Sequence, residues 1–181
     1  MQIEKTTLPG VLILTPQRFG DARGWLIETW NAERMAQAGL DLAFVQDNHS
    51  FSAQKGTLRG LHYQSPPRAQ DKLVRCTRGA IRDVAVDGRR SSPTYGKWVD
   101  VELSAENGRQ LLVPKGFLHG FVTLTPDCEV QYKCTDTYAP AHDGAVRWDS
   151  VGIDWGLSGD PVLSAKDAAA PAFADWQSPF E

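Results

Sequence analysis

Three side chains that can move protons, His62, Lys72 and Tyr132, lie on short segments that alternate between polar and apolar positions. His62 belongs to TLRGLHYQ, residues 57–64, and follows two glycines, Gly56 and Gly60. A histidine in such a segment can bind a metal ion, act as a general base, or occupy a polar position in a barrel wall. The neighbours of these residues narrow the choice.

Side chains two residues apart on a strand share a face. By this rule His62 aligns with Gly60 and Gln64, Lys72 with Val74 and Cys76, and Tyr132 with Val130 and Cys134. Such faces favour the lumen of a barrel with a few polar groups, a common setting for small-molecule sites. The same rule places Arg59 opposite His62, unless Gly60 allows the strand to bulge.

Most of the chain is expected to form short strands separated by turn residues. The expected strands cover residues 10–14, 43–52, 57–64, 71–77, 80–87, 97–103, 109–114, 119–125 and 129–136. One helix is expected after Asn31, a suitable N-cap, with Gly39 as its stop. This spacing favours one mainly β domain over residues 1–181, an antiparallel jelly-roll barrel with a few short helices.

The composition excludes several classes of protein. The 181 residues carry a net charge of -3, and the basic residues are scattered, which argues against nucleic-acid binding. No apolar run approaches the ~20 residues of a membrane span, and the N-terminus has no pattern of an export signal. Three cysteines without a C-x-x-C pair favour a cytoplasmic protein with reduced thiols.

Two spacing patterns resemble the signature motifs of the cupin superfamily of small jelly-roll barrels. In the first, five residues separate Gly56 from His62. The second comprises Gly108, Pro114, Gly116 and His119. Metal-binding cupins continue the first motif with a second histidine and a glutamate, whereas this chain has Gln64 and no following glutamate. His62 and His119 alone fall short of the three protein ligands usual in catalytic zinc sites, so we interpret His62 as an acid–base group and expect no metal.

The sequence resembles the dTDP-4-dehydrorhamnose 3,5-epimerase family over nearly its whole length. The resemblance is carried by FGDARGWLIETW (19–30), FVQDNHSFS (44–52), GTLRGLHYQ (56–64), DKLVRCTRGAIRDVAVDGRRSSPTYGKW (71–98), LLVPKGFLHGFVTL (111–124), YKCTDTYAP (132–140), WDSVGIDW (148–155) and LSAKD (163–167). It implies an isomerase of rhamnose biosynthesis that needs no cofactor. Its substrate would be dTDP-4-dehydro-6-deoxy-D-glucose, inverted at C3 and C5 to dTDP-4-dehydro-L-rhamnose through an enediolate.

The resemblance also implies catalytic roles for four residues. His62 would be the base, oriented by Asp167, and Tyr132 would return a proton from the opposite face. Lys72 would stabilise the enolate oxygen. From the sequence alone, Asp167 fits the first turn of a helix, Lys72 fits a rim position, and Tyr132 fits a buried aromatic with a satisfied hydroxyl.

The implied substrate-binding residues surround this set. Arg23 and Arg59 would contact the diphosphate, and Tyr138 would stack on thymine. The other ligand positions are Glu28, Gln46, Asp47, Asn48, His119 and Lys166. Asp143 stands where the family often has glutamate, and its shorter side chain leaves a contact that water can bridge. In the family, Arg23 typically reaches the adjacent subunit's site, which implies a homodimer formed by exchange of N-terminal strands.

The same residues argue against several other activities. Tyr132 argues against a 3,4-ketoisomerase, which needs no donor on that face, and Gln64 argues against a metal-dependent dioxygenase. The joint presence of a base, a cation and a phenol argues against a binding-only module. An epimerase of a single carbon stays open, because the outcome depends on how the sugar ring reorients in the pocket.

Overall fold

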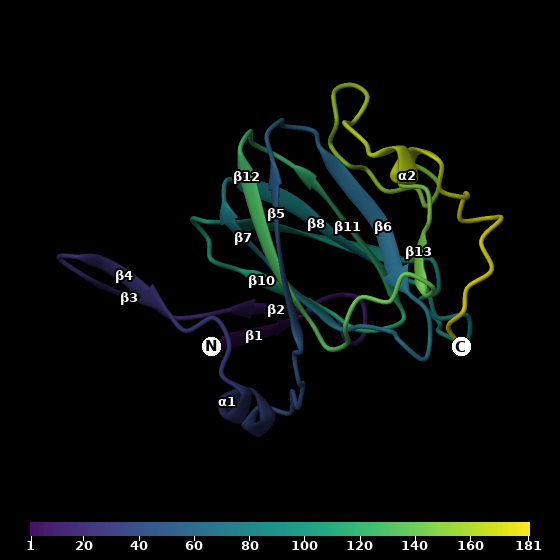
Figure 1. The fold of residues 1–181 in the computed structure, drawn as a ribbon. Helices are drawn as coiled ribbons and strands as arrows, with labels where there is room; N and C mark the ends of the chain where they lie inside the picture. Colours follow the sequence, from purple (N-terminus) through teal and green to yellow (C-terminus); the bar gives the residue numbers. More distant parts are fainter.

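A computed structural model describes all of residues 1–181. The alternating segments form two antiparallel sheets that pack face to face (Figure 1). One sheet has the order β1 (Gln2–Lys5), β2 (Leu12–Thr15), β10 (Gln110–Val113), β7 (Lys72–Arg78), β12 (Cys128–Cys134) and β5 (Gln46–Ser52). The other has the order β13 (Asp143–Ala145), β6 (Leu58–Gln64), β11 (Phe117–Thr123), β8 (Ala80–Asp87) and β9 (Trp98–Ser104).

The remaining elements are short. They are the hairpin β3 (Arg18–Asp21) and β4 (Gly24–Ile27), with helices α1 (Ala32–Gln37) and α2 (Ala165–Ala168). The prediction of a mainly β, cupin-like jelly roll with few helices is confirmed, and all nine expected strands are present. Asn31 caps α1 as expected, its side chain accepting a hydrogen bond from the Arg34 amide. No helix is long and apolar enough to cross a bilayer.

The space between the sheets changes from apolar to polar along the strands. Near one end, Cys76 of β7 pairs with Val130 of β12, and both are buried in the main hydrophobic core. Near the other end of the same two strands, Lys72 pairs with Cys134. The apolar end supplies the burial that stabilises the barrel, and the polar end is therefore free to form a cavity.

The outer faces of the sheets are covered in different ways. Aromatic residues of the C-terminal segment, including Trp155, Trp176 and Phe180, pack against the five-stranded sheet. Met35 of α1 packs on the outer face of the six-stranded sheet with Leu73. The β3–β4 hairpin, in contrast, projects away from the barrel (Figure 1), and nearly all of its side chains are exposed.

A bulge on β6 sets the orientation of its side chains. His62 pairs with His119 and Arg59 pairs with Phe121, so two residues of β6 oppose the single Gly120 of β11. Gly60 sits in this bulge with φ +126°. A Cβ atom at Gly60 would lie 2.6 Å from the Cα of Gly120, so no larger residue fits without movement of the backbone.

We expect Gly60→Ala to destabilise the protein more than Gly24→Ala, and urea unfolding of both variants measures the difference. Gly24 has φ +127° but nothing within 4 Å of its would-be Cβ, so it isolates the backbone strain, roughly 1–3 kcal/mol. The clash at Gly60 should add roughly another 1–3 kcal/mol. Equal losses in the two variants would contradict a tight contact between β6 and β11.

Candidate active site

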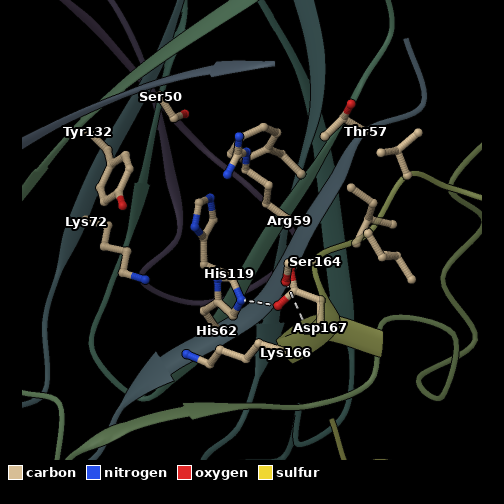
Figure 2. A pocket seen from close by; sticks show the side chains of 14 residues that line it. Ser50, Thr57, Arg59, His62, Lys72, His119, Tyr132, Ser164, Lys166 and Asp167 are labelled. Carbon is tan, nitrogen blue, oxygen red and sulfur yellow. Dashed lines mark hydrogen bonds and ion pairs between the residues drawn. The ribbon is translucent and has the colours of Figure 1, made fainter. Parts of the chain in front are cut away.

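A cavity of about 380 Å³ opens between the two sheets at the polar end of the barrel, within the size range of small-molecule sites. Figure 2 shows side chains from both walls and from α2 converging on it. Its polar lining consists of Ser50, Thr57, Arg59, His62, Lys72, His119, Tyr132, Ser164, Lys166 and Asp167. A second depression of about 330 Å³ shares His62, Lys72, Tyr132 and Lys166 with it, so the two form one continuous cleft.

His62 and Asp167 form an imidazole–carboxylate pair at the floor of the cleft. The His62 Nε2 atom lies 2.5 Å from the Asp167 Oδ1 atom, and Asp167 is buried in the first turn of α2 (Figure 2). Burial is the largest single influence and tends to raise the pKa of Asp167, but the hydrogen bond and charge of His62, together with hydrogen bonds from Ser164 and the Gly60 backbone, outweigh it and lower that pKa. A carboxylate that accepts the Nε2 proton leaves Nδ1 as the basic nitrogen of His62.

Lys72 and Tyr132 belong to the opposite sheet, on β7 and β12. Burial lowers the pKa of the Lys72 ammonium, which is poorly solvated and therefore well suited to pair with an anionic oxygen. Burial also raises the pKa of Tyr132, which keeps its phenol protonated as a hydrogen-bond and proton donor. An imidazole on one wall thus lies across the cleft from a phenol and an ammonium on the other (Figure 2).

Arg59 also lines the cavity, although simple alternation places it on the other side of β6 from His62. The bulge at Gly60 changes the phase of the strand, so both side chains face the same space. The Arg59 guanidinium donates hydrogen bonds to the Ser52 hydroxyl and the Phe51 carbonyl of β5. These bonds hold its charge beside the C-terminal end of β5.

His119 forms a second imidazole–carboxylate pair beside the first. Its Nε2 atom lies 2.8 Å from the Oδ1 atom of Asp83, and both residues are buried. His119 is the register partner of His62 on the neighbouring strand, so the two rings line the cleft together. No group of three or more His, Cys, Asp or Glu side chains is arranged to hold a metal ion.

The outer part of the cleft contains a small polar network. The Lys166 Nζ atom lies 2.5 Å from the Asp143 Oδ2 atom, which also accepts a hydrogen bond of 3.1 Å from the Tyr138 hydroxyl. The side chain of Gln46 accepts the backbone N–H of Tyr138 at 2.7 Å. Asn48 lies nearby on the same face of β5 as Gln46.

Three of the expected ligand residues lie apart from this cleft. Arg23 sits at the tip of the exposed hairpin and pairs with Asp21 at 2.5 Å. Glu28 pairs with Arg34 at 2.9 Å. Asp47 points to the outer face of β5 and pairs with Lys133, because strand alternation cannot turn 46, 47 and 48 inward together.

Several residues that line the cavity were not predicted from the sequence. Ser50 follows Asn48 by two positions and shares its face, so the alternation rule would have found it. Phe121 likewise follows His119 by two positions on β11 and shares its face. Thr57 and Ser164 carried no comparable signal, because their positions depend on the bulge in β6 and on the path of the C-terminal segment.

The jelly-roll fold places the chain in the class of cupin-like barrels, here with a cleft equipped for proton transfer. The family model for dTDP-4-dehydrorhamnose 3,5-epimerase matches residues 5–175. The enzyme of that name from Salmonella typhimurium is 53% identical over 94% of both chains, and the one from Sinorhizobium fredii is 48% identical over 100% of this chain and 94% of its own.

The solved structures agree with the sequence comparison. The dTDP-6-deoxy-D-glucose-3,5-epimerase of Legionella pneumophila, determined in complex with dTDP-4-keto-L-rhamnose, superposes with a TM-score of 0.93. It is 45% identical and covers 97% of this chain and 94% of its own. The chain belongs to the dTDP-4-dehydrorhamnose 3,5-epimerase family, and it is an isomerase.

We expect Asp167→Asn to lower kcat by roughly 10²-fold or more, the scale of general-base catalysis, because the amide no longer stabilises a protonated His62. Asp83→Asn is the matched control, since it alters the other imidazole–carboxylate pair. It should raise KM more than it lowers kcat. Steady-state kinetics of both variants measure the effect, and a similar kcat loss in each would remove the distinction between the two pairs.

Proposed function

We propose that this protein converts dTDP-4-dehydro-6-deoxy-D-glucose to dTDP-4-dehydro-L-rhamnose by inverting C3 and C5 without a cofactor. The observation that carries the proposal is the placement of His62 and Tyr132 on facing walls of one cleft (Figure 2). Inversion needs a base on one side of the sugar ring and an acid on the other. The family assignment supports both this chemistry and its place in rhamnose biosynthesis.

The first step of the proposed reaction is removal of a proton from a carbon next to the ketone. His62 accepts this proton on the nitrogen that Asp167 leaves free. The resulting imidazolium is stabilised by the adjacent carboxylate, whose lowered pKa keeps it ionised at neutral pH. Because the ketone withdraws electrons from both neighbouring carbons, the same base serves C3 and C5 in turn.

The negative charge that forms on the ketone oxygen is stabilised by Lys72. A buried cation already in place beside a developing oxyanion contributes on the order of 3 kcal/mol to the transition state. Tyr132 then donates its proton to the carbon from the opposite face, which inverts the centre. Its raised pKa supports this role, because the phenol is fully protonated before each turnover.

The nucleotide part of the substrate occupies the edges of the cleft in this proposal. Arg59 and Lys166 supply positive charge for the diphosphate, and the exposed ring of Tyr138 stacks on thymine. Gln46, Asn48 and His119 line the space between and offer hydrogen bonds to the substrate. Asp143 takes part through Lys166 and Tyr138, which it already contacts.

We place the reaction in the cytoplasm, with residues 1–181 acting as one catalytic domain. The three cysteines are buried and form no disulfide bond, which supports a reducing compartment. The proposed site draws on β5, β6, β7, β11, β12 and α2, which span residues 46–168, so most of the chain contributes to it.

The reaction is tested by incubating the protein with dTDP-4-dehydro-6-deoxyglucose in deuterated water and analysing the product by NMR. We expect deuterium at both C3 and C5, with a rate unchanged by EDTA. Deuterium at one carbon would identify a single-carbon epimerase of another deoxysugar pathway. No deuterium, or activity that EDTA abolishes and metal restores, would contradict the proposed chemistry.

The projecting hairpin supports a homodimer. Arg23 has 90% of its side chain exposed at the hairpin tip, away from its own cleft. Phe19, Trp25 and Leu26 on the same hairpin expose apolar surface, and exposed apolar patches of this kind mark contacts with another protein. We propose that the N-terminal strands are exchanged so that the hairpin packs on a second copy and brings Arg23 and Glu28 to the partner's cleft.

This arrangement is tested by co-expressing Arg23→Ala and His62→Ala chains and purifying the mixture. Each variant alone should be nearly inactive. If Arg23 serves the partner's cleft, half of the dimers are mixed and each contains one intact site. The mixture should then recover about a quarter of wild-type activity. A mixture no more active than its parents would show that Arg23 does not act across subunits.

A further inference from the structure

Gln64 is a buried residue whose side-chain amide is fully engaged with backbone groups. Its Nε2 atom donates hydrogen bonds to the carbonyls of Arg68, at 2.6 Å, and Thr137, at 3.2 Å. Its Oε1 atom accepts the N–H of Ala139 at 2.9 Å. Gln64 therefore ties the segment after β6 to the segment after β12.

The same two segments are joined by further bonds. The Arg68 guanidinium donates to both carboxylate oxygens of Asp136, at 2.8 and 2.7 Å. Gln70 donates to the Asp136 carbonyl at 2.7 Å. We refer to residues 64–71 and 135–139, joined in this way, as the clasp.

The clasp holds the backbone on both sides of Tyr138. The carbonyl of Thr137 and the N–H of Ala139 are both bound by Gln64, and the N–H of Tyr138 itself is bound by Gln46. The Tyr138 ring is nevertheless 57% exposed and lines the cleft. An exposed aromatic ring on a tightly held backbone offers a flat surface at low cost in conformational entropy.

We infer that Gln64 is a positioning residue for nucleotide recognition. Through its hydrogen bonds in the clasp it fixes the backbone of Tyr138 before the substrate arrives. The inference rests on the proposed stacking of Tyr138 on the thymine base. Gln64 makes its hydrogen bonds to the clasp backbone, and the reacting carbons would lie at His62 and Tyr132. Its effect should therefore appear in nucleotide affinity and KM and hardly at all in kcat.

The test compares Gln64→Met with Tyr138→Ala and with the double variant, using calorimetric titration with dTDP. Methionine has a similar volume to glutamine but makes none of the three bonds. We expect Gln64→Met to weaken dTDP binding about tenfold, a loss within the range of one stacked base. In the Tyr138→Ala background the same change should have little further effect, because coupled residues are not additive. The kcat of Gln64→Met should stay within about twofold of wild type.

Gln110→Met is the matched control. Gln110 is also buried and donates from its side chain to a backbone carbonyl, that of Thr29, on the outer face of the other sheet. It should leave dTDP affinity unchanged. If Gln64→Met fails to fold, Asp136→Asn weakens the same clasp at a side chain that is 30% exposed, and the same cycle with Tyr138→Ala applies.

The results of these titrations and kinetic measurements distinguish failure of the Gln64 inference from failure of the proposed function on which it rests. Additive losses in the double variant, or a fall in kcat as large as the loss in affinity, would overturn the positioning role of Gln64 while leaving the proposed reaction in place. Unchanged dTDP affinity in Tyr138→Ala would overturn the stacking assignment itself. Non-additive losses confined to binding and KM would support the clasp.

Discussion

The close approach of β6 to β11 at Gly60 and Gly120 determines how the rest of the site is built. Without the bulge, strict alternation would send Arg59 and His62 to opposite faces of the sheet. With it, the cation and the imidazole face one cleft, and His62 comes within reach of Asp167 on α2. Only glycine satisfies both the backbone angle and the contact distance at residue 60.

The two sheets divide the chemistry between them. The five-stranded sheet supplies both imidazoles, each paired with a carboxylate, and the six-stranded sheet supplies Lys72 and Tyr132. Burial acts in opposite senses on these last two, since it lowers the pKa of the ammonium and raises the pKa of the phenol. The phenol therefore stays protonated and the ammonium is poorly solvated, so in the proposed reaction a substrate that becomes anionic meets two donors with little competing solvation.

Much of this could be predicted from the sequence, because alternation is a local property. The strands, the Asn31 cap and the inward faces of Lys72 and Tyr132 follow from spacing alone. The pairing of His62 with Asp167 joins residues 105 positions apart, and only the family resemblance suggested it. The inward turn of Arg59 depends on the bulge in β6. The strands β3 and β4 are exposed almost throughout, so they lack the alternation of buried and exposed positions by which a strand is predicted from sequence.

The central claim, a base on one wall and an acid on the other, is tested most directly by hydrogen exchange into recovered substrate in deuterated water. His62 keeps 32% of its side chain exposed, so a proton it removes can exchange with solvent. We predict that Tyr132→Phe incorporates deuterium next to the ketone but yields little inverted product, whereas His62→Asn incorporates none. Exchange by His62→Asn at the wild-type rate would contradict the account.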